Sequence, residues 1–170
     1  MEKISDIKTL TEEELKNWLK EVGEKPFRAD QIRNRLFCGQ VKSFDAMETI
    51  PAALREKLSA NFRITSLEEA KRLLSEDGTV KWLYRTHDGY HIETVLIPTN
   101  DRFSVCVSTQ IGCAQNCAFC RTAKMGFIRN LEAGEILEEI IRVNWYLEET
   151  GTKHSDGSLA KVTNIIFMGM

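Results

Sequence analysis

Three cysteines in one short segment constrain the fold of this chain more than any other feature. Cys113, Cys117 and Cys120 follow a Cys-x3-Cys-x2-Cys spacing inside residues 106–129. An iron–sulfur cluster needs several thiolates brought together on one short loop, and three thiolates leave one iron of a four-iron cluster open. The spacing therefore predicts a loop that holds such a cluster, with the rest of the chain arranged around it.

Zinc binding, disulfide formation and simple burial fit these cysteines less well. Structural zinc sites close with four ligands, and no histidine or fourth cysteine lies nearby. The chain has five cysteines, an odd number, and no secretory signal, which disfavours disulfides. Buried apolar cysteines are common, but here the segment is flanked by polar residues such as Gln115 and Arg121.

The charge of the chain is nearly balanced. It has 23 Lys and Arg against 25 Asp and Glu, for a formal net charge of −2 over 170 residues. A global basic field for nucleic acid is absent, so any RNA contact must come from local patches. The sequence has no apolar run long enough to span a bilayer and no targeting segment, and we expect a reducing cytoplasm.

The first 65 residues predict a small helical module. Thr11 and Glu14 have the spacing of a capping box, and Gly23 ends the first helical pattern. A second helix is expected to start near Pro26. Shorter helices are expected at residues 43–47 and 51–62.

The following residues switch to the alternating pattern of β-strands. Strands are expected at residues 70–75, 80–85, 90–97 and 102–108, with glycine-containing turns after the first two. This antiparallel meander leads directly into the cysteine loop.

Residues 131–149 predict the longest helix. Its isoleucines, valine and leucine form the expected buried stripe, and its glutamates form the expected solvent-facing side: Glu132, Glu135, Glu138, Glu139, Glu148 and Glu149. Residues 161–168 predict a buried strand. Together with the strand at 102–108, they predict one right-handed β-α-β unit. Such a unit cannot bury its own faces, so we expect the amino-terminal part of a larger barrel enzyme.

Candidate RNA-binding residues lie between positions 23 and 37. Cations alternate there with aromatic residues: Lys25, Phe27, Arg28, Arg33, Arg35 and Phe37. Cations can bind phosphates and aromatic rings can stack on bases. The alternative is a solvated helix face with an apolar back, and both interpretations stay open.

Glu93 lies within the apolar strand sequence HIETVLIP. Most such carboxylates face solvent on the polar side of a strand. Burial beside an active site would instead make it a candidate general base. The spacing of residues in the strand does not distinguish these two interpretations of Glu93.

The cysteine spacing, with Phe119 before the last cysteine, resembles the signature of the radical S-adenosylmethionine (SAM) enzymes. A more specific resemblance, to the RlmN family of bacterial dual-specificity RNA methyltransferases, runs in order along nearly the whole chain. Its segments are residues 23–31, 77–82, 93–95, 106–108, 110–113 and 167–170.

The resemblance implies an α/β fold in three parts. Residues 1–65 would be a helical accessory domain that binds RNA, and residues 66–100 a β meander or linker. Residues 101–170 would begin a partial TIM-like radical SAM barrel.

It also implies a reaction. The family methylates carbon 2 of an adenine in large-subunit ribosomal RNA and in tRNA through a methyl-cysteine intermediate. This carbon is electrophilic, which requires a radical route. The implied cofactors are a 4Fe-4S cluster and SAM. The implied electron donor is a flavodoxin, and we expect a cytoplasmic monomer that does not bind membranes.

Site residues are implied by position. Cys113, Cys117 and Cys120 match the cluster ligands. Cys106 matches the cysteine that resolves the covalent adduct with RNA through a disulfide to a carboxyl-terminal cysteine, and Glu93 matches the proton acceptor. Which of Glu93 and Cys106 takes the carbon-2 proton stays open.

The family's methyl-carrying cysteine and its Gly-Glu-Pro segment would lie beyond Met170, so this chain alone is expected to be inactive. Two alternatives remain. One is the related antibiotic-resistance methyltransferase that modifies carbon 8 of adenine. The other is a non-catalytic RNA-binding or iron–sulfur fragment.

Overall fold

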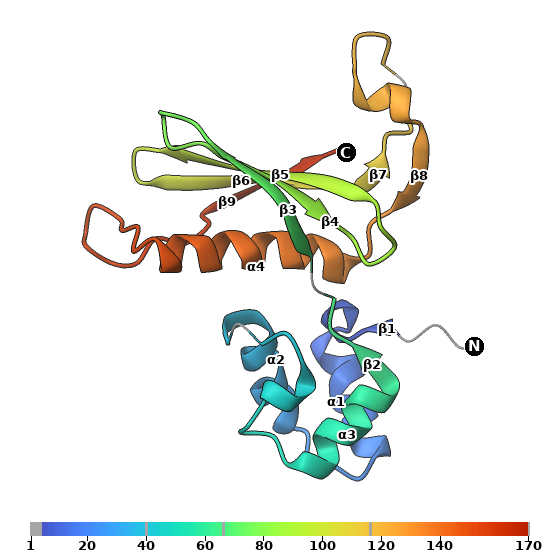
Figure 1. Ribbon diagram of the computed structural model, residues 1–170. Helices are drawn as coiled ribbons and strands as arrows, with labels where there is room; N and C mark the ends of the chain where they lie inside the picture. The colour runs from blue at the N-terminus through green and yellow to red at the C-terminus, as the bar shows by residue number, and fades with distance from the viewer. Residues whose placement is uncertain (1–4, 40, 66, 116, 170) are drawn as a thin grey trace. The chain divides into compact units, whose positions relative to one another are not determined.

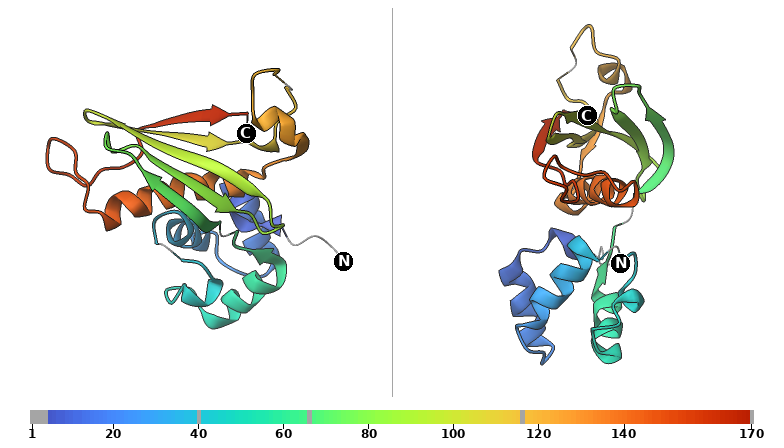
Figure 2. Two further views of the ribbon diagram at one scale, coloured as in Figure 1. Left: turned by 45° about the horizontal axis from the view of Figure 1, so that its top comes forward. Right: turned by 90° about the vertical axis from the view of Figure 1, so that its left-hand side faces the viewer.

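The computed structural model describes residues 5–39, 41–65, 67–115 and 117–169. Contacts divide the chain into two units, residues 1–65 and 66–170. Figures 1 and 2 show that the first unit is mainly helical and the second is built on a sheet. Residues 66–100 belong to the same unit as the residues that follow them.

The first unit contains the helices that the sequence predicts and two short strands that it does not. Its elements are β1 (Ser5–Asp6), η1 (Ile7–Thr9), α1 (Glu12–Glu21), α2 (Arg28–Cys38), η2 (Phe44–Ala46), α3 (Ala52–Asn61) and β2 (Phe62–Arg63). The predicted capping box of α1 is confirmed, with the Thr11 hydroxyl accepting from the Glu14 backbone and the Glu14 carboxylate accepting from the Thr11 backbone. β1 and β2 pair in parallel.

The core of this unit consists of apolar side chains from all three helices, among them Leu15, Leu19, Ile32, Leu54 and Leu58. Their helical spacing is what turns one face of each helix inward. A buried polar contact joins the two ends of the unit. The carboxylate oxygens of Asp6 accept from the backbone N–H of Lys8 at 2.8 Å and of Thr65 at 3.2 Å.

The second unit is built on a five-stranded sheet. Its strands are β3 (Glu68–Leu74), β4 (Val80–Arg85), β5 (His91–Thr99), β6 (Arg102–Ser108) and β9 (Asn164–Met168). They lie in the order β3-β4-β5-β6-β9. The first four form the predicted antiparallel meander, and β9 lies parallel to β6. With α4 (Ala133–Glu149), β6 and β9 make the predicted β-α-β unit, and the mixed α/β class is confirmed.

α4 covers one face of this sheet (Figures 1 and 2). Alternate residues of β4, β5 and β6 are buried, as the two-residue period of a strand requires. The core beneath α4 includes Trp82, Tyr84, Ile92, Leu96, Val105 and Val107 from the sheet and Val143 and Leu147 from the helix. No closed barrel is present in the described residues.

The solvent-facing side predicted for α4 is partly wrong. Glu135, Glu138 and Glu139 are buried, because each has polar partners that replace water. Arg129 donates to Glu135 and Arg142 donates to Glu138, while Thr94 and the Ser108 backbone donate to Glu139. Glu135 and Glu138 are thus buried charges with cationic partners, whereas Glu139 has only neutral donors.

The burial predicted for the last strand is also wrong. β9 is the outermost strand next to β6, and Ile165, Ile166 and Phe167 are exposed. The prediction rested on apolar composition, which does not reveal whether a strand has a neighbour on both sides. Met170, the end of the segment that resembles the RlmN family, lies outside the described residues.

Three short elements between β6 and α4 were not predicted. They are β7 (Gln110–Gly112), η3 (Thr122–Met125) and β8 (Phe127–Asn130). β7 and β8 pair antiparallel and form a hairpin separate from the main sheet. None of the described helices combines the length and apolar character needed to cross a membrane.

Candidate functional site

The cysteine loop, residues 113–126, is closed at its neck by two glycines. The Cys113 N–H donates to the Gly126 carbonyl at 3.1 Å, where the strands of the hairpin meet. Gly112 has φ +72°, and a Cβ there would stand 1.7 Å from the Gly126 oxygen. Only glycine permits both this conformation and this close approach. The β7–β8 hairpin therefore holds the two ends of the loop together.

The three cysteines lie on this loop, and none of them is in a disulfide. Cys113 and Cys120 are partly buried and Cys117 is exposed. The Cys120 N–H donates to the Cys117 carbonyl at 3.0 Å, so these two residues lie in one tight turn. Phe119, between them, is 94% exposed.

The end of β9 approaches the loop at Gly169. A Cβ on Gly169 would lie 3.5 Å from the Cys113 sulfur, so the end of β9 is within van der Waals reach of this thiol. The Thr109 hydroxyl donates to the Met168 carbonyl at 2.6 Å and joins the carboxyl ends of β6 and β9. In α/β sheets, ligands bind beyond the carboxyl ends of parallel strands. The loop thus lies at the end of the sheet where a ligand is expected.

Glu93 and Cys106 lie on the face of the sheet opposite α4. Cys106 is paired with Val95 on β5 and Ile166 on β9, two residues along β5 from Glu93. Residues in this diagonal relation lie about 7–8 Å apart on one face of a sheet. The structure thus brings the two candidate proton-transfer residues to the same surface.

The immediate surroundings of the two residues differ. Glu93 forms an ion pair with Lys81 at 2.6 Å, and its side chain is 31% exposed, so the buried-carboxylate interpretation does not apply. It lines a cavity of about 140 Å³ together with Lys71, Leu73, Lys81 and Leu83. Burial raises the pKa of the Cys106 thiol above its ordinary value.

The candidate RNA-binding cations on α2 separate into two groups. Arg28, Gln31 and Arg35 share one face, since they are three and four residues apart. Arg35 lines a pocket of about 380 Å³ with Gln31, Asn34, Cys38, Gly39 and Thr49.

Arg33 has a different environment. Its guanidinium lies 5.1 Å from the centre of the Phe37 ring and donates to the Leu10 carbonyl. Arg28 donates to the Gln31 side chain at 2.7 Å and Arg35 to the Thr49 hydroxyl at 3.3 Å, so all three arginines have partners within their unit. Lys25 is exposed in the turn before α2.

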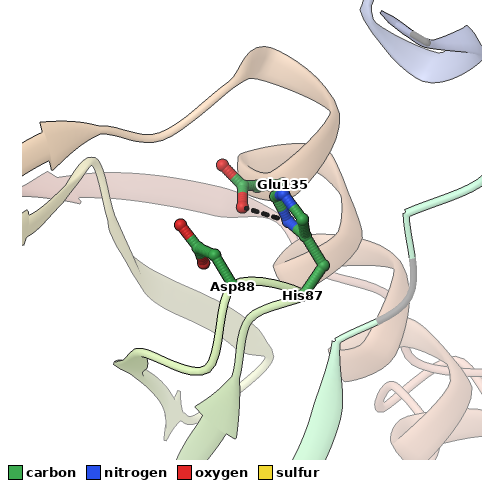
Figure 3. Close-up of side chains that lie close together, drawn as sticks. All are labelled: His87, Asp88 and Glu135. Carbon is green, nitrogen blue, oxygen red and sulfur yellow. Dashed lines mark ion pairs between the residues drawn. The ribbon is translucent and has the colours of Figure 1, made fainter. Parts of the chain in front are cut away.

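A charged cluster beside the hairpin was missed from the sequence. Figure 3 shows His87 and Asp88, from the turn between β4 and β5, close to Glu135 in the first turn of α4. The donor atoms of these three residues lie within 4.8 Å of one another, the one such group of metal-ligating side chains among the described residues. Arg129 contacts both carboxylates at 2.7–2.8 Å and already supplies the positive charge. The cluster is therefore an ion-pair network rather than a metal site.

The sulfurs of Cys113, Cys117 and Cys120 do not form a second group of this kind in the part of the chain that the structure describes.

A second carboxylate missed from the sequence is Glu139, beneath the sheet. One of its oxygens accepts from the Thr94 hydroxyl and from the Ser108 N–H at 3.1 Å, and the other has no partner. Burial raises its pKa to about 8. Glu139 stands three and four positions from apolar residues of the same helix, so it lies on their side of the helix. This spacing is the sequence signal that could have indicated its burial.

Comparison with known proteins gives consistent matches along the chain. A family model described as the ribosomal RNA large subunit methyltransferase N-terminal domain matches residues 5–64. The dual-specificity RNA methyltransferase RlmN of Anaeromyxobacter dehalogenans is 45% identical over 165 residues, which cover 97% of this chain and 44% of that protein. A probable dual-specificity RNA methyltransferase RlmN of Bacillus pumilus is 46% identical over 157 residues, 92% of this chain and 41% of that protein.

A solved structure gives the same result. The crystal structure of a radical SAM methyltransferase from Sphaerobacter thermophilus matches with a TM-score of 0.84 and 38% identity, over 98% of this chain and 47% of that one. The chain thus spans less than half the length of the proteins it matches.

Proposed function

Because the chain belongs to the RlmN family and matches the amino-terminal part of its members, we propose that it supplies the cluster loop and an RNA-binding unit of a radical SAM methyltransferase. The proposed reaction is methylation of carbon 2 of adenine in large-subunit ribosomal RNA and in tRNA, through a methyl-cysteine intermediate. One observation supports it most: three cysteines outside any disulfide lie on one glycine-closed loop at the carboxyl ends of β6 and β9. An electron donor such as a flavodoxin, a monomeric state and a cytoplasmic location belong to the same proposal.

The residues present fit a 4Fe-4S cluster. Cys113, Cys117 and Cys120 would bind three irons, and the donor set has no fourth thiol on the loop. When bound with SAM, such a cluster supplies a 5′-deoxyadenosyl radical.

Glu93 and Cys106 would handle protons on the open face of the sheet. An ordinary thiol is already mostly protonated at neutral pH, and burial raises the pKa of Cys106 further. Glu93 is a carboxylate paired with Lys81 and lines an open cavity. We therefore assign the acceptance of the carbon-2 proton to Glu93, and the later resolution of the RNA adduct to Cys106.

RNA contact by the first unit would use Arg28 and Arg35, with Lys25 beside them. The Arg28 guanidinium lies 5.0 Å from the centre of the exposed Phe27 ring, and Arg35 lines the pocket beside α2. A cation next to an exposed ring can bind a phosphate while the ring stacks on a base.

The cluster is tested on anaerobically reconstituted protein. We expect about four irons per chain and an EPR signal of the reduced protein that changes when SAM is added. The Cys113→Ala, Cys117→Ala, Cys120→Ala variant should lose both. Cys38→Ala, which removes an exposed cysteine of the other unit, is the matched control and should keep both. Zinc, or no metal, in the unchanged chain would contradict the proposal.

RNA binding is tested with variants of α2. Arg35→Gln and Arg28→Gln should each weaken binding of an RNA hairpin and lower the salt dependence, by about one unit of log–log slope for each lost phosphate contact. Arg33→Gln is the control, because Arg33 is two residues from Arg35 and therefore lies on another face of α2. Equal losses in all three variants would refute the assignment.

Mapping the methylated carbon in RNA treated with the intact protein separates carbon 2 from carbon 8.

A further inference from the structure

The second strand of the β7–β8 hairpin has little apolar contact by which to hold its position. β7 and β8 share a short antiparallel register with one irregularity. Phe127 and Ile128 on β8 are exposed, whereas Ile111 on β7 is buried in the core beneath the sheet. Because hydrophobic burial is the main term that fixes packed elements, β8 needs another interaction to hold it in place.

Arg129 supplies that interaction. It is paired with Ile111 across the hairpin, so both side chains point to the same side. Its Nε and Nη2 donate to the two oxygens of Asp88 at 2.8 and 3.1 Å. Its Nη1 and Nη2 donate to the two oxygens of Glu135 at 2.7 and 2.8 Å.

The remaining donor of Arg129 is also used. Nη1 donates to the Asn130 carbonyl at 3.1 Å. An arginine has five N–H groups in a rigid planar arrangement, and all five are engaged here. The contacts raise the pKa of Arg129, and Arg129 lowers that of Asp88 below its usual range.

Both carboxylates are themselves fixed. Asp88 accepts from the Thr86 hydroxyl at 2.6 Å in the turn between β4 and β5. Glu135 is fully buried and accepts from the Glu132 N–H at 2.8 Å, where it caps α4. Arg129 therefore joins three elements: the strand that ends the cysteine loop, the turn that precedes the strand of Glu93, and the helix below the sheet.

We propose that Arg129 is a positioning residue for the cysteine loop: with Asp88 and Glu135 it sets the orientation of the β7–β8 hairpin relative to the open face that carries Glu93 and Cys106. The role in catalysis rests on the proposed function. The role in holding the hairpin does not, since it concerns only contacts within the second unit.

The first test uses the protein without metal. Amide hydrogen exchange is measured for Arg129→Gln, Arg129→Lys and Glu135→Gln. We expect exchange at residues 110–130 to rise by roughly 10- to 100-fold in Arg129→Gln, the change expected when charge-assisted hydrogen bonds are lost. Arg129→Lys keeps the charge without the planar fork and should give a smaller rise.

Arg72→Gln is the matched control, because Arg72 forms a surface ion pair with Glu69 away from the hairpin. Its exchange at residues 110–130 should equal that of the unchanged chain. Equal exchange in Arg129→Gln would overturn the proposal. If Arg129→Gln does not fold, Arg129→Lys and Glu135→Gln decide by the same criterion.

The second test uses the reconstituted protein and a spectroscopic readout. If Arg129 only added stability, a folded Arg129→Gln variant would respond to SAM as the unchanged chain does. We expect that it binds iron, but that the SAM concentration needed to change the EPR signal rises by roughly 10- to 100-fold, as is typical when a residue supporting metal ligands is lost. An unchanged SAM response would overturn the catalytic part. Absence of iron in the unchanged chain would refute the proposed function and leave the hydrogen-exchange result to decide the rest.

Discussion

The two faces of the five-stranded sheet carry different kinds of side chain. The face under α4 holds the core of the unit, including Trp82 and Val105. The other face carries Cys106 and the ion pair between Glu93 and Lys81, and none of these side chains is fully buried. Because side chains alternate along a strand, neighbouring residues such as Val105 and Cys106 belong to different faces. The same strands thus stabilise the unit through the side chains of one face and carry the candidate catalytic residues on the other.

The largest effect is expected for Trp82 on the covered face. Trp82 is 1% exposed and packs edge-on against Tyr146, with ring centres 5.1 Å apart. Trp82→Ala should lower the free energy of unfolding of the second unit by about 3–5 kcal/mol, because it leaves a cavity. Leu83, the next residue along β4, is partly exposed on the open face and gives the comparison. Leu83→Ala should lower the free energy of unfolding by less than about 1.5 kcal/mol. Urea unfolding measures both, and equal losses would show that the two faces do not differ.

Glu139 on the covered face predicts a pH dependence. The carboxyl group is protonated in the folded chain up to a pKa of about 8, against an ordinary value of 4.5. The unfolded chain loses this proton at lower pH, so stability falls as pH rises from about 4.5 to 8 and then levels off. Glu139→Gln keeps a neutral group and should be about 2–4 kcal/mol more stable than the unchanged chain at pH 9, with little difference at pH 5.

Urea unfolding at pH 5, 7 and 9 tests this dependence. Glu149→Gln, at the exposed end of the same helix, should show no such divergence and serves as the control. A constant difference between Glu139→Gln and the unchanged chain at all three pH values would contradict the expected protonation.

A smaller effect concerns thiol reactivity on the open face. Burial raises the pKa of Cys106, whereas Cys117 is exposed on the loop. Since the thiolate is the reacting form, alkylation at pH 8 without metal should be roughly tenfold slower at Cys106 than at Cys117. Mass spectrometry of labelled peptides gives both rates. Faster labelling of Cys106 would mean that this face is more open than its burial indicates.

The smallest effect is expected for the ion pair on the open face. The side chains of Lys81 and Glu93 are 45% and 31% exposed. Exposed pairs of this kind contribute at most about 1 kcal/mol, so Lys81→Gln should change the free energy of unfolding by less than that. The remaining difference should shrink at 1 M salt, where charges are screened over about 3 Å. A loss comparable to that of Trp82→Ala would remove the distinction between the faces.

The sequence predicts those parts of the fold that depend on local pattern. Thr11 and Glu14 indicate the start of α1, and alternation indicates β4 and β6 at their observed bounds. The β7–β8 hairpin is missed because its strands are short and its pairing depends on a contact between Gly112 and Gly126. Neither apolar alternation nor a standard turn dipeptide marks such a hairpin.

The candidate site divides in the same way. The cysteine loop is evident from spacing alone, because its ligands are close in sequence. The burial of Glu139 is not, because its partners Thr94 and Ser108 are 45 and 31 positions away. A helical pattern cannot reveal that a distant strand offers donors to a glutamate.

The closed neck of the cysteine loop has an entropic consequence. A flexible segment loses conformational freedom when its ends are brought together, and most of that loss is independent of what the segment then binds. Here the hydrogen bond between Cys113 and Gly126 and the pairing of β7 with β8 join the ends during folding. Binding of a group by the three thiols would then order only the interior of the loop. Part of the conformational entropy that ligation would otherwise remove is already lost when the hairpin forms.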